Sequence, residues 1–174
     1  MSGFLNKYIP KKNMPGVLFV FVLGTLSHFF YHWSGGNGLI ALFCPINESR
    51  WEHLKLLFFP YLLFSIWDCC HSPKVQTTVR LLCRFFGVFC GMIAIITLFY
   101  TYTGVIGLHF LILDILIFLI GVLVSFSLPP LLMKRHITVP SDTAIYMLWA
   151  FTLLSFFVFT GFPPNIPLFF PPPQ

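Results

Sequence analysis

The stretch VIGLHFLILDILIFLIGVLVSFSL, residues 105–128, contains one carboxylate, Asp114, and neither lysine nor arginine. A membrane hydrocarbon core of about 30 Å takes about 20 helical residues to cross, and this stretch is long enough. Its apolar residues cover every face of a helix, whereas the strands of a membrane barrel alternate apolar and polar residues over about ten positions. The stretch therefore predicts a transmembrane α-helix.

Four other apolar stretches have the same character, at residues 14–33, 51–67, 79–101 and 143–161. The chain of 174 residues is 57% hydrophobic and only 9% charged, whereas soluble proteins carry about 25% charged residues. No segment outside these stretches is long enough to bury a soluble core, and residues 162–174 form a proline-rich outer tail. We therefore predict an all-α integral membrane protein with five transmembrane helices in a single domain, residues 1–174.

The lysine and arginine residues lie at alternate ends of the predicted helices. By the positive-inside rule, connections rich in these residues face the cytoplasm, which predicts a cytoplasmic amino terminus and a carboxyl terminus outside the cell membrane. The net charge of +5 is spread over separate helix ends, so we expect the lipid bilayer and not nucleic acid as a partner. The residues are Lys7, Lys11 and Lys12 before the first helix, Lys74, Arg80 and Arg84 around the connection to the third, and Lys134 and Arg135 before the fifth.

The segment NESRWEHLK, residues 47–55, places two of the five acidic residues beside an arginine, a histidine and a lysine. In the predicted topology this cassette lies on the outer side, where the last turns of the first helix carry His28 and His32. Tyr100 and Tyr102 end the third helix on the same side, and such tyrosines are typical of the aromatic belt at a membrane surface. The polar groups together predict a pocket that opens to the outside.

Asp114 is the acidic residue that the sequence places deep inside a predicted helix. It lies nine residues below the outer start of that helix, which corresponds to a depth of about 13 Å. An ionised side chain near the middle of a membrane costs at least about 2.5 kcal/mol, so such residues usually face a bundle interior or a wet cavity. His109 and Asp114 lie about 140° apart around a helix, so we expect only Asp114 to face the pocket.

The histidines of this region have a spacing that suits a metal ion. His28 and His32 are at i and i+4, so their imidazoles lie on one helical face with Cβ atoms about 5–6 Å apart. Zinc takes three or four nitrogen, oxygen or sulfur ligands, and the candidate ligands are His28, His32, His53 and Glu48. Two histidines near an interface can equally hydrogen-bond headgroups or water, so the spacing leaves both interpretations open.

Glu48 and Glu52 are also at i and i+4, provided that the helix begins early enough to include both. Like charges at this spacing repel, so they require a cation, a shared proton or neutralisation by Arg50 and Lys55. Glu52 also completes the pattern S-x-x-E from Ser49, which is typical of a capping box at a helix start. The candidate catalytic carboxylates are Glu48, Glu52 and Asp114.

Four segments together resemble a family of small multi-pass bacterial membrane proteins that is catalogued as a domain of unknown function. They are CPINESRWEHLKLLFFP (44–60), FYTYTGVIG (99–107), LILDILIF (111–118) and FPPNIPLF (162–169), and the likeness covers nearly the whole chain. The resemblance implies a protein of the bacterial inner membrane but no established activity. Members tend to carry a glutamate where this chain has His32, so the histidine pair is not a family signature.

Three kinds of function agree with these features. The first is a metal-dependent intramembrane hydrolase of a lipid or lipid-linked substrate, in which His28, His53 and a carboxylate hold zinc and another carboxylate is the general base. The second is a small transporter or a binding protein for a lipid or small molecule, which with five helices would need a homodimer to form a path. The third is a non-catalytic accessory membrane subunit. The sequence alone does not choose between an enzyme and the other two.

Overall fold

The computed structural model describes residues 9–71, 77–135 and 141–171, and the regular structure of these residues is entirely helical. Five helices are long and apolar enough to cross a membrane, which confirms the predicted fold class. Lys7 and Lys74, which contribute to the predicted topology, lie outside the described residues. In chain order the helices are η1 (Lys11–Asn13), α2 (Met14–Trp33), α3 (Gly38–Phe43), α4 (Arg50–His71), α5 (Thr77–Ile106), α6 (Leu111–Met133), α7 (Asp142–Gly161) and η2 (Pro167–Phe169).

The helix boundaries differ from the prediction between α5 and α6. The sequence predicts a turn at residues 102–104, but α5 continues to Ile106 and α6 begins only at Leu111. Gly107 has a φ of 79°, the left-handed conformation in which helices commonly end. The shift places Asp114 in the first turn of α6. The predicted depth of about 13 Å was therefore wrong, because three helical residues span only about 4.5 Å.

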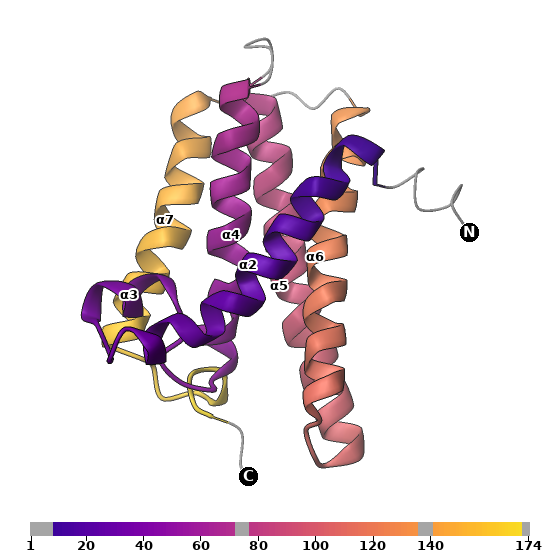
Figure 1. Cartoon of the computed structure of the whole chain (residues 1–174). Helices are drawn as coiled ribbons and strands as arrows, with labels where there is room; N and C mark the ends of the chain where they lie inside the picture. The colour runs from indigo at the N-terminus through magenta and orange to yellow at the C-terminus, as the bar shows by residue number, and fades with distance from the viewer. Residues whose placement is uncertain (1–8, 72–76, 136–140, 172–174) are drawn as a thin grey trace.

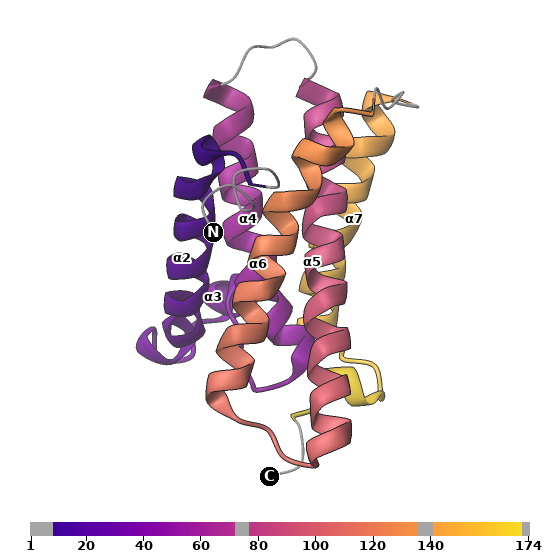
Figure 2. The same ribbon diagram turned by 90° about the vertical axis from the view of Figure 1, so that its right-hand side faces the viewer.

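The five long helices run up and down as a bundle, with α5 and α6 side by side along most of their length (Figure 1, Figure 2). The first of them, α2, crosses the bundle obliquely, and the short α3 lies between the end of α2 and the start of α4 (Figure 1). Of the apolar part of α4, 56% is buried, compared with 17% for α7, so α4 forms the centre of the bundle.

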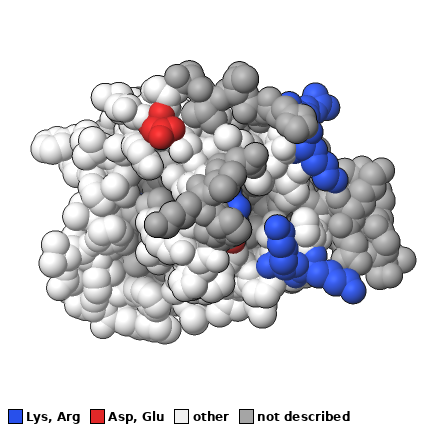
Figure 3. Space-filling view, turned by 90° about the horizontal axis from the view of Figure 1, so that it is seen from above, with Lys and Arg blue, Asp and Glu red and all other residues white. Residues whose placement is uncertain are grey.

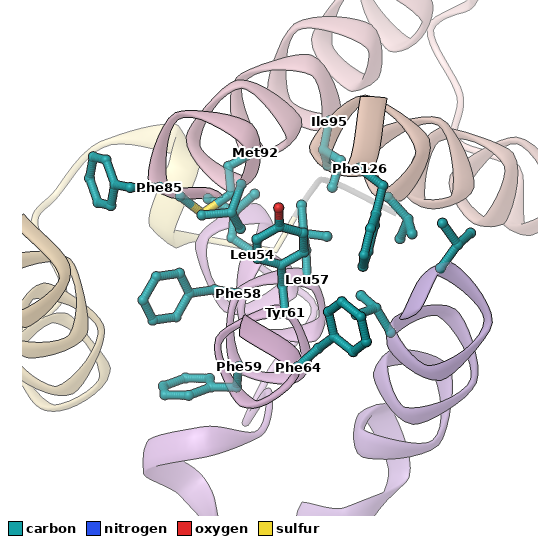
Figure 4. Packing of buried hydrophobic residues seen from close by; sticks show 14 of the residues in the cluster. Leu54, Leu57, Phe58, Phe59, Tyr61, Phe64, Phe85, Met92, Ile95 and Phe126 are labelled. Atoms are coloured by element: carbon teal, nitrogen blue, oxygen red, sulfur yellow. The ribbon is translucent and has the colours of Figure 1, made fainter. Parts of the chain in front are cut away.

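The core of the bundle is a cluster of aromatic and aliphatic side chains to which all five long helices contribute, and its centre lies between α4, α5 and α6 (Figure 4). Leu57, Phe58 and Tyr61 of α4 are fully buried, and the Tyr61 ring meets the edge of Phe126 of α6 at a centroid distance of 4.9 Å. The Tyr61 hydroxyl donates a hydrogen bond of 2.9 Å to the Ser125 carbonyl, so this buried group is paired. Because lipid tails are as apolar as the helices, close packing and such hydrogen bonds hold the helices together.

Small residues bring α5 and α6 into close contact, as the sequence pattern of glycines suggests. A Cβ atom added at Gly121 would lie 2.5 Å from Cγ1 of Ile95, and one added at Gly91 would lie 2.6 Å from the carbonyl oxygen of Gly121. Larger side chains at these positions would push the two helices apart. The close hairpin fixes the positions of Tyr102 and Asp114, which lie near its closed end.

Exposed basic side chains gather at the end of the bundle where α2 begins and α6 ends, which we call the basic end (Figure 3). At the same end, Arg84 donates a hydrogen bond of 2.8 Å to Asp68, and Arg80 lies 3.7 Å from the same carboxylate. This clustering is the pattern that the positive-inside rule associates with the cytoplasmic face. The exposed residues are Lys11, Lys12, Lys134 and Arg135.

Candidate functional site

The NESRWEHLK cassette lies at the end opposite the basic end, where the chain enters α4 (Figure 1). Because α4 begins at Arg50, the backbone N–H of Glu52 donates to the Ser49 hydroxyl at 3.3 Å, and Ser49 caps the helix. The Glu52 carboxylate accepts a hydrogen bond of 3.0 Å from the Ile46 backbone and does not complete a capping box. Glu48 precedes the helix and so does not share a helical face with Glu52.

Glu52 and Lys55 form a buried ion pair outside the group of histidines. The Lys55 ammonium lies 2.8 Å from Glu52 and also donates to the Ala41 carbonyl at 2.9 Å and the Thr160 hydroxyl at 2.6 Å. Lys55 is fully buried, and Glu52 is 3% exposed. The pair links α4 to α3 and α7 and neutralises the carboxylate inside the protein. This arrangement is typical of a structural network.

His28 from α2, Glu48 from the loop and His53 from α4 meet at one place. Oε1 of Glu48 lies 3.6 Å from Nε2 of His28, and Oε2 lies 3.3 Å from Nε2 of His53. One ligand atom from each of the three residues lies within 4.8 Å of the other two. Tetrahedral zinc with bonds of about 2.0–2.1 Å places its ligand atoms about 3.3 Å apart, so the three residues fit three corners of such a site.

His53 has the orientation that a metal ligand needs. Its Nδ1–H donates a hydrogen bond of 2.9 Å to the Ser49 carbonyl, because a carbonyl oxygen can only accept. Nε2 therefore faces Glu48, as in metal sites whose histidines are oriented by a backbone carbonyl. When Nε2 of His53 also carries a proton, its hydrogen bond to Glu48 lowers the pKa of the carboxyl group to about 2, and a metal would take the place of that proton. The carboxylate is thus ionised at neutral pH and available as a ligand.

His32 lies one helical turn beyond His28, and the structure does not bring it into this group. Its side chain is exposed, and the second imidazole of the group is that of His53. The two rings of His28 and His53 lie 5.2 Å apart between centroids. Which histidine of α2 contacts His53 depends on how α2 crosses α4. The spacing of His28 and His32 within α2 does not predict this.

The three residues line a pocket of about 460 Å³ to which α2, α4 and α6 contribute. Leu111 and Ile115 of α6 also line it, and these side chains are 74% and 43% exposed. The pocket is therefore bordered by exposed apolar side chains of a helix that is long and apolar enough to cross a membrane. Its charged or titratable lining residues are His28, Glu48, Arg50, His53, His109 and Asp114.

Asp114 lies in the wall of the same pocket and contacts three polar groups. The Tyr102 hydroxyl donates a hydrogen bond to its Oδ1 atom. Nη1 of Arg50 and Nδ1 of His109 each lie 3.8 Å from Oδ2. His109 precedes α6, so the angle expected for two residues of one helix does not apply, and both side chains line the pocket. The expectation that only Asp114 of the two faces the pocket was wrong.

Arg50 lines the pocket and Tyr102 contacts its wall through Asp114, and the sequence assigns both residues other roles. The Arg50 guanidinium stacks on the Phe99 ring at 3.7 Å from its centroid, and Tyr102 reaches Asp114 and does not merely join the aromatic belt. The sequence does contain a signal that Tyr102 lies near Asp114. Tyr102 and Asp114 are equally far from Leu108, so a helical hairpin that turns there places them opposite each other.

The proline-rich tail packs against the same end of the bundle. In η2, Phe169 is 7% exposed and lies 4.9 Å from the Trp51 ring and 5.3 Å from the Phe159 ring, measured between centroids. This contact anchors the tail to α4 and α7. Two residues further on, Pro171 lines the pocket. The tail therefore supplies part of the pocket wall.

Comparison with known proteins gives a family but no function. A family of unknown function, DUF6512, matches residues 4–172, which include all five long helices and every pocket residue named above. No curated protein and no solved structure matches the chain. With nearly its whole length matched, the chain belongs to the DUF6512 family of unknown function.

Proposed function

We propose that this protein is a zinc-dependent intramembrane hydrolase that acts on a lipid or lipid-linked substrate. The observation that carries the proposal is the convergence of His28, Glu48 and His53 from three separate segments on a pocket that also holds Asp114. Charged and titratable residues are costly in a membrane protein and commonly mark functional sites. Two imidazoles and a carboxylate form a ligand set that is typical of catalytic zinc.

Each group has a role in the proposed reaction. His28, Glu48 and His53 would hold the zinc ion, which would lower the pKa of a bound water to about 7. Asp114 is the candidate general base, which accepts a proton from this water and returns it to the leaving oxygen. The water oxygen bonds to the carbon or phosphorus of the ester, the ester bond breaks, and the leaving oxygen takes the proton.

The walls of the pocket support a lipid as substrate. Leu111, Ile115 and Phe118 line the pocket on its α6 side, and the first two are exposed to the surroundings of the bundle. A substrate with acyl chains can keep these chains in the bilayer while its ester group enters the polar part of the pocket. A fully water-soluble substrate would gain nothing from such a wall.

Metal analysis of the purified protein tests this function. We expect about one zinc per chain, lost when His28, Glu48 or His53 is replaced by alanine, because each change removes one of only three protein ligands. His32→Ala is the matched control, since His32 is a histidine of the same helix outside the group. Absence of zinc from folded wild-type protein, or equal loss in the control, contradicts the proposal.

A binding or transport function is the second candidate, and one contact favours it. The Glu48 carboxylate already lies within 3.6 Å of His28 and 3.3 Å of His53, so these groups can satisfy one another by sharing protons without a metal. Such a group can hold a proton or a polar cargo. Folded protein that contains no metal and retains a pH-dependent interaction with a small ligand would support this candidate over the hydrolase.

We also propose that the pocket opens on the outer face of the cell membrane, because the basic end satisfies the positive-inside rule for the cytoplasmic face. A membrane-impermeant maleimide applied to intact cells tests the orientation. In a protein otherwise free of cysteine, we expect labelling of His32→Cys and not of Lys134→Cys. Both side chains are exposed, at opposite ends of the bundle. The reverse pattern would contradict the orientation.

A further inference from the structure

We propose that Arg50 forms an anion-binding subsite of the pocket, which receives the phosphate group of a phosphorylated lipid. The proposal rests on the hydrolase function above and names its substrate class, a lipid phosphate ester. It assigns Arg50 to the phosphate and leaves His28, Glu48 and His53 to the metal. The evidence lies in the burial, the partners and the stacking of the arginine.

Arg50 is a buried cation without a hydrogen-bonding partner among the described residues. It is 7% exposed, and its Nε–H is fully buried with no acceptor. The nearest carboxylate oxygen, in Asp114, lies 3.8 Å from Nη1, which is beyond hydrogen-bonding distance. Of the five N–H donors of the guanidinium, the one on Nε is therefore buried without an acceptor, and leaving such a group unpaired away from water is costly. The arginine therefore requires an acceptor that the described protein does not supply.

The other two buried cations of the described residues each have a protein acceptor. Lys55 donates to three acceptors. Arg84 donates a hydrogen bond of 2.8 Å to the Asp68 carboxylate, although its Nε–H, like that of Arg50, lacks an acceptor. Neither of these two residues lines the pocket, whereas Arg50 borders a cavity of about 460 Å³. The cation without a hydrogen bond is thus the one that a ligand can reach.

Asp114 forms an ion pair with Arg50 but does not hydrogen-bond it. Its Oδ1 accepts the hydrogen bond of Tyr102, and its Oδ2 lies equally far from Arg50 and His109, at 3.8 Å. The flat face of the guanidinium lies on the Phe99 ring, which leaves the N–H edge for a ligand. Phosphate oxygens match this edge by accepting two parallel hydrogen bonds. The geometry therefore favours phosphate over an uncharged ester.

The charges of the pocket should make phosphate bind more tightly when the metal is present than when it is absent. Without a metal, Glu48 and Asp114 oppose the entry of an anion. A zinc ion held by His28, Glu48 and His53 would add two positive charges to the pocket and offset these carboxylates. By reciprocal linkage, zinc must strengthen phosphate binding and phosphate must strengthen zinc binding by the same factor.

Calorimetry on the zinc-loaded protein in detergent tests the subsite with three probes, which are dioctanoyl phosphatidic acid, dioctanoylglycerol and inorganic phosphate. We expect the phosphatidic acid to bind about 10- to 100-fold more tightly than dioctanoylglycerol, the range that hydrogen bonds to charged groups provide. Equal affinity of these two lipids overturns the proposal. Inorganic phosphate should bind more weakly than the phosphatidic acid, and the reverse order overturns the assignment to a lipid.

Arg50→Met is the decisive variant, because it keeps the volume of the side chain and removes a charge whose Nε–H has no acceptor, while Asp114 keeps its hydrogen bond from Tyr102, so folding should stay intact. We expect phosphatidic acid affinity to fall about 10- to 100-fold with zinc content unchanged. Arg50→Lys, which keeps the charge but loses the fork of donors, should lose part of the affinity. Arg80→Gln removes a cation at the basic end and should bind normally. Wild-type affinity in Arg50→Met overturns the proposal.

The metal measurement separates failure of this inference from failure of the proposed function. Wild-type protein that binds no zinc contradicts the hydrolase, but binding of phosphatidic acid that depends on Arg50 still supports the subsite. If the protein binds zinc and the Arg50→Met change leaves its affinity for phosphatidic acid unaltered, the subsite alone is contradicted.

Discussion

Two polar networks arise from the same cassette, and they differ in how completely their charges are satisfied. In the first, Lys55 is fully buried and donates to Glu52, Ala41 and Thr160, so this network is closed to ligands. In the second, His28, Glu48, His53, Arg50 and Asp114 surround a pocket, and Arg50 lacks a hydrogen bond among the described residues. Buried charges that are fully hydrogen-bonded hold helices together, whereas a buried charge without a hydrogen bond beside a cavity indicates a binding site.

The start of α4 separates the two networks. Glu52 and Lys55 are three residues apart on one helical face, and Arg50 and His53 are three residues apart on another. Neighbouring residues such as Glu52 and His53 differ by about 100° around the helix, so adjacent charges point in different directions. Because Ser49 caps the helix, Glu48 remains in the loop and turns toward the histidines. The cap at Ser49 thus separates Glu52 and Lys55, which link helices, from Glu48, Arg50 and His53, which line the pocket.

Breaking the closed network should have the largest effect. Lys55→Met leaves the buried Glu52 carboxylate without its counter-ion, and removing one partner of a buried ion pair costs about 3–5 kcal/mol of unfolding free energy. The measurement is denaturant unfolding of the purified protein in detergent. Replacing both residues, as Glu52→Leu with Lys55→Met, should recover most of the loss because no unpaired charge remains. A single variant as stable as wild type would show that the network is not structural.

Changing Asp114 should affect the chemistry of the open network and not the fold. Asp114→Asn keeps the shape and can still hydrogen-bond Tyr102, but it cannot accept a proton from water. We expect hydrolysis of a lipid phosphate ester to fall about 100- to 10,000-fold, the range that general base catalysis provides. Zinc content should stay at the wild-type level because Asp114 is outside the ligand group. Full activity in this variant would exclude Asp114 as the base.

Removing the Tyr102 hydroxyl should have an intermediate effect. Tyr102→Phe deletes the donor to Oδ1 of Asp114 and leaves the ring contact with Phe99 in place. A hydrogen bond to a charged group contributes about 1.5–3 kcal/mol, so we expect a loss of activity of about tenfold or more. Tyr100→Phe is the matched control, since the tyrosine that donates to Asp114 is Tyr102. Equal effects of the two changes would show that Tyr102 does not position Asp114.

The sequence predicts the fold well because each membrane-crossing helix is encoded locally. A run of apolar residues must satisfy its backbone hydrogen bonds within itself, so length and composition alone identify the helix. The end of α5 was missed by a few residues, because Gly104 and Gly107 look alike in the sequence and only Gly107 adopts the left-handed conformation. That error propagated to the expected depth of Asp114 and the expected direction of His109.

The site was only partly predictable, because its members come from different helices. His28, Glu48 and His53 were chosen for their residue types, and the structure brings them together. The sequence could not show that His32 and Glu52 fall outside the group, since this depends on how α2 crosses α4 and where α4 begins. The need of Arg50 for a partner is likewise visible only from its burial and its distance to Asp114.

The smallest effect is expected for the contribution of Glu48 to stability, which contrasts with that of Lys55. The pKa of Glu48 is lowered to about 2 by the hydrogen bond from the doubly protonated His53 ring, below the usual value of about 4.3. Its ionised form therefore stabilises the fold fully above about pH 4.3, and this contribution is lost as the pH falls through about 2. Because the side chain is 64% exposed, solvent screening should keep the contribution below about 1 kcal/mol.

Glu48→Gln measures this contribution directly. Without zinc, we expect the variant to be less stable than wild type by under about 1 kcal/mol at pH 6, and the difference should shrink toward pH 2 as the wild-type carboxylate becomes protonated. Denaturant unfolding at several pH values provides the comparison. A loss as large as that of Lys55→Met would mean that the open network also holds the bundle together. The charges around the pocket would then be explained by their contribution to stability, and they would no longer indicate a bound ligand.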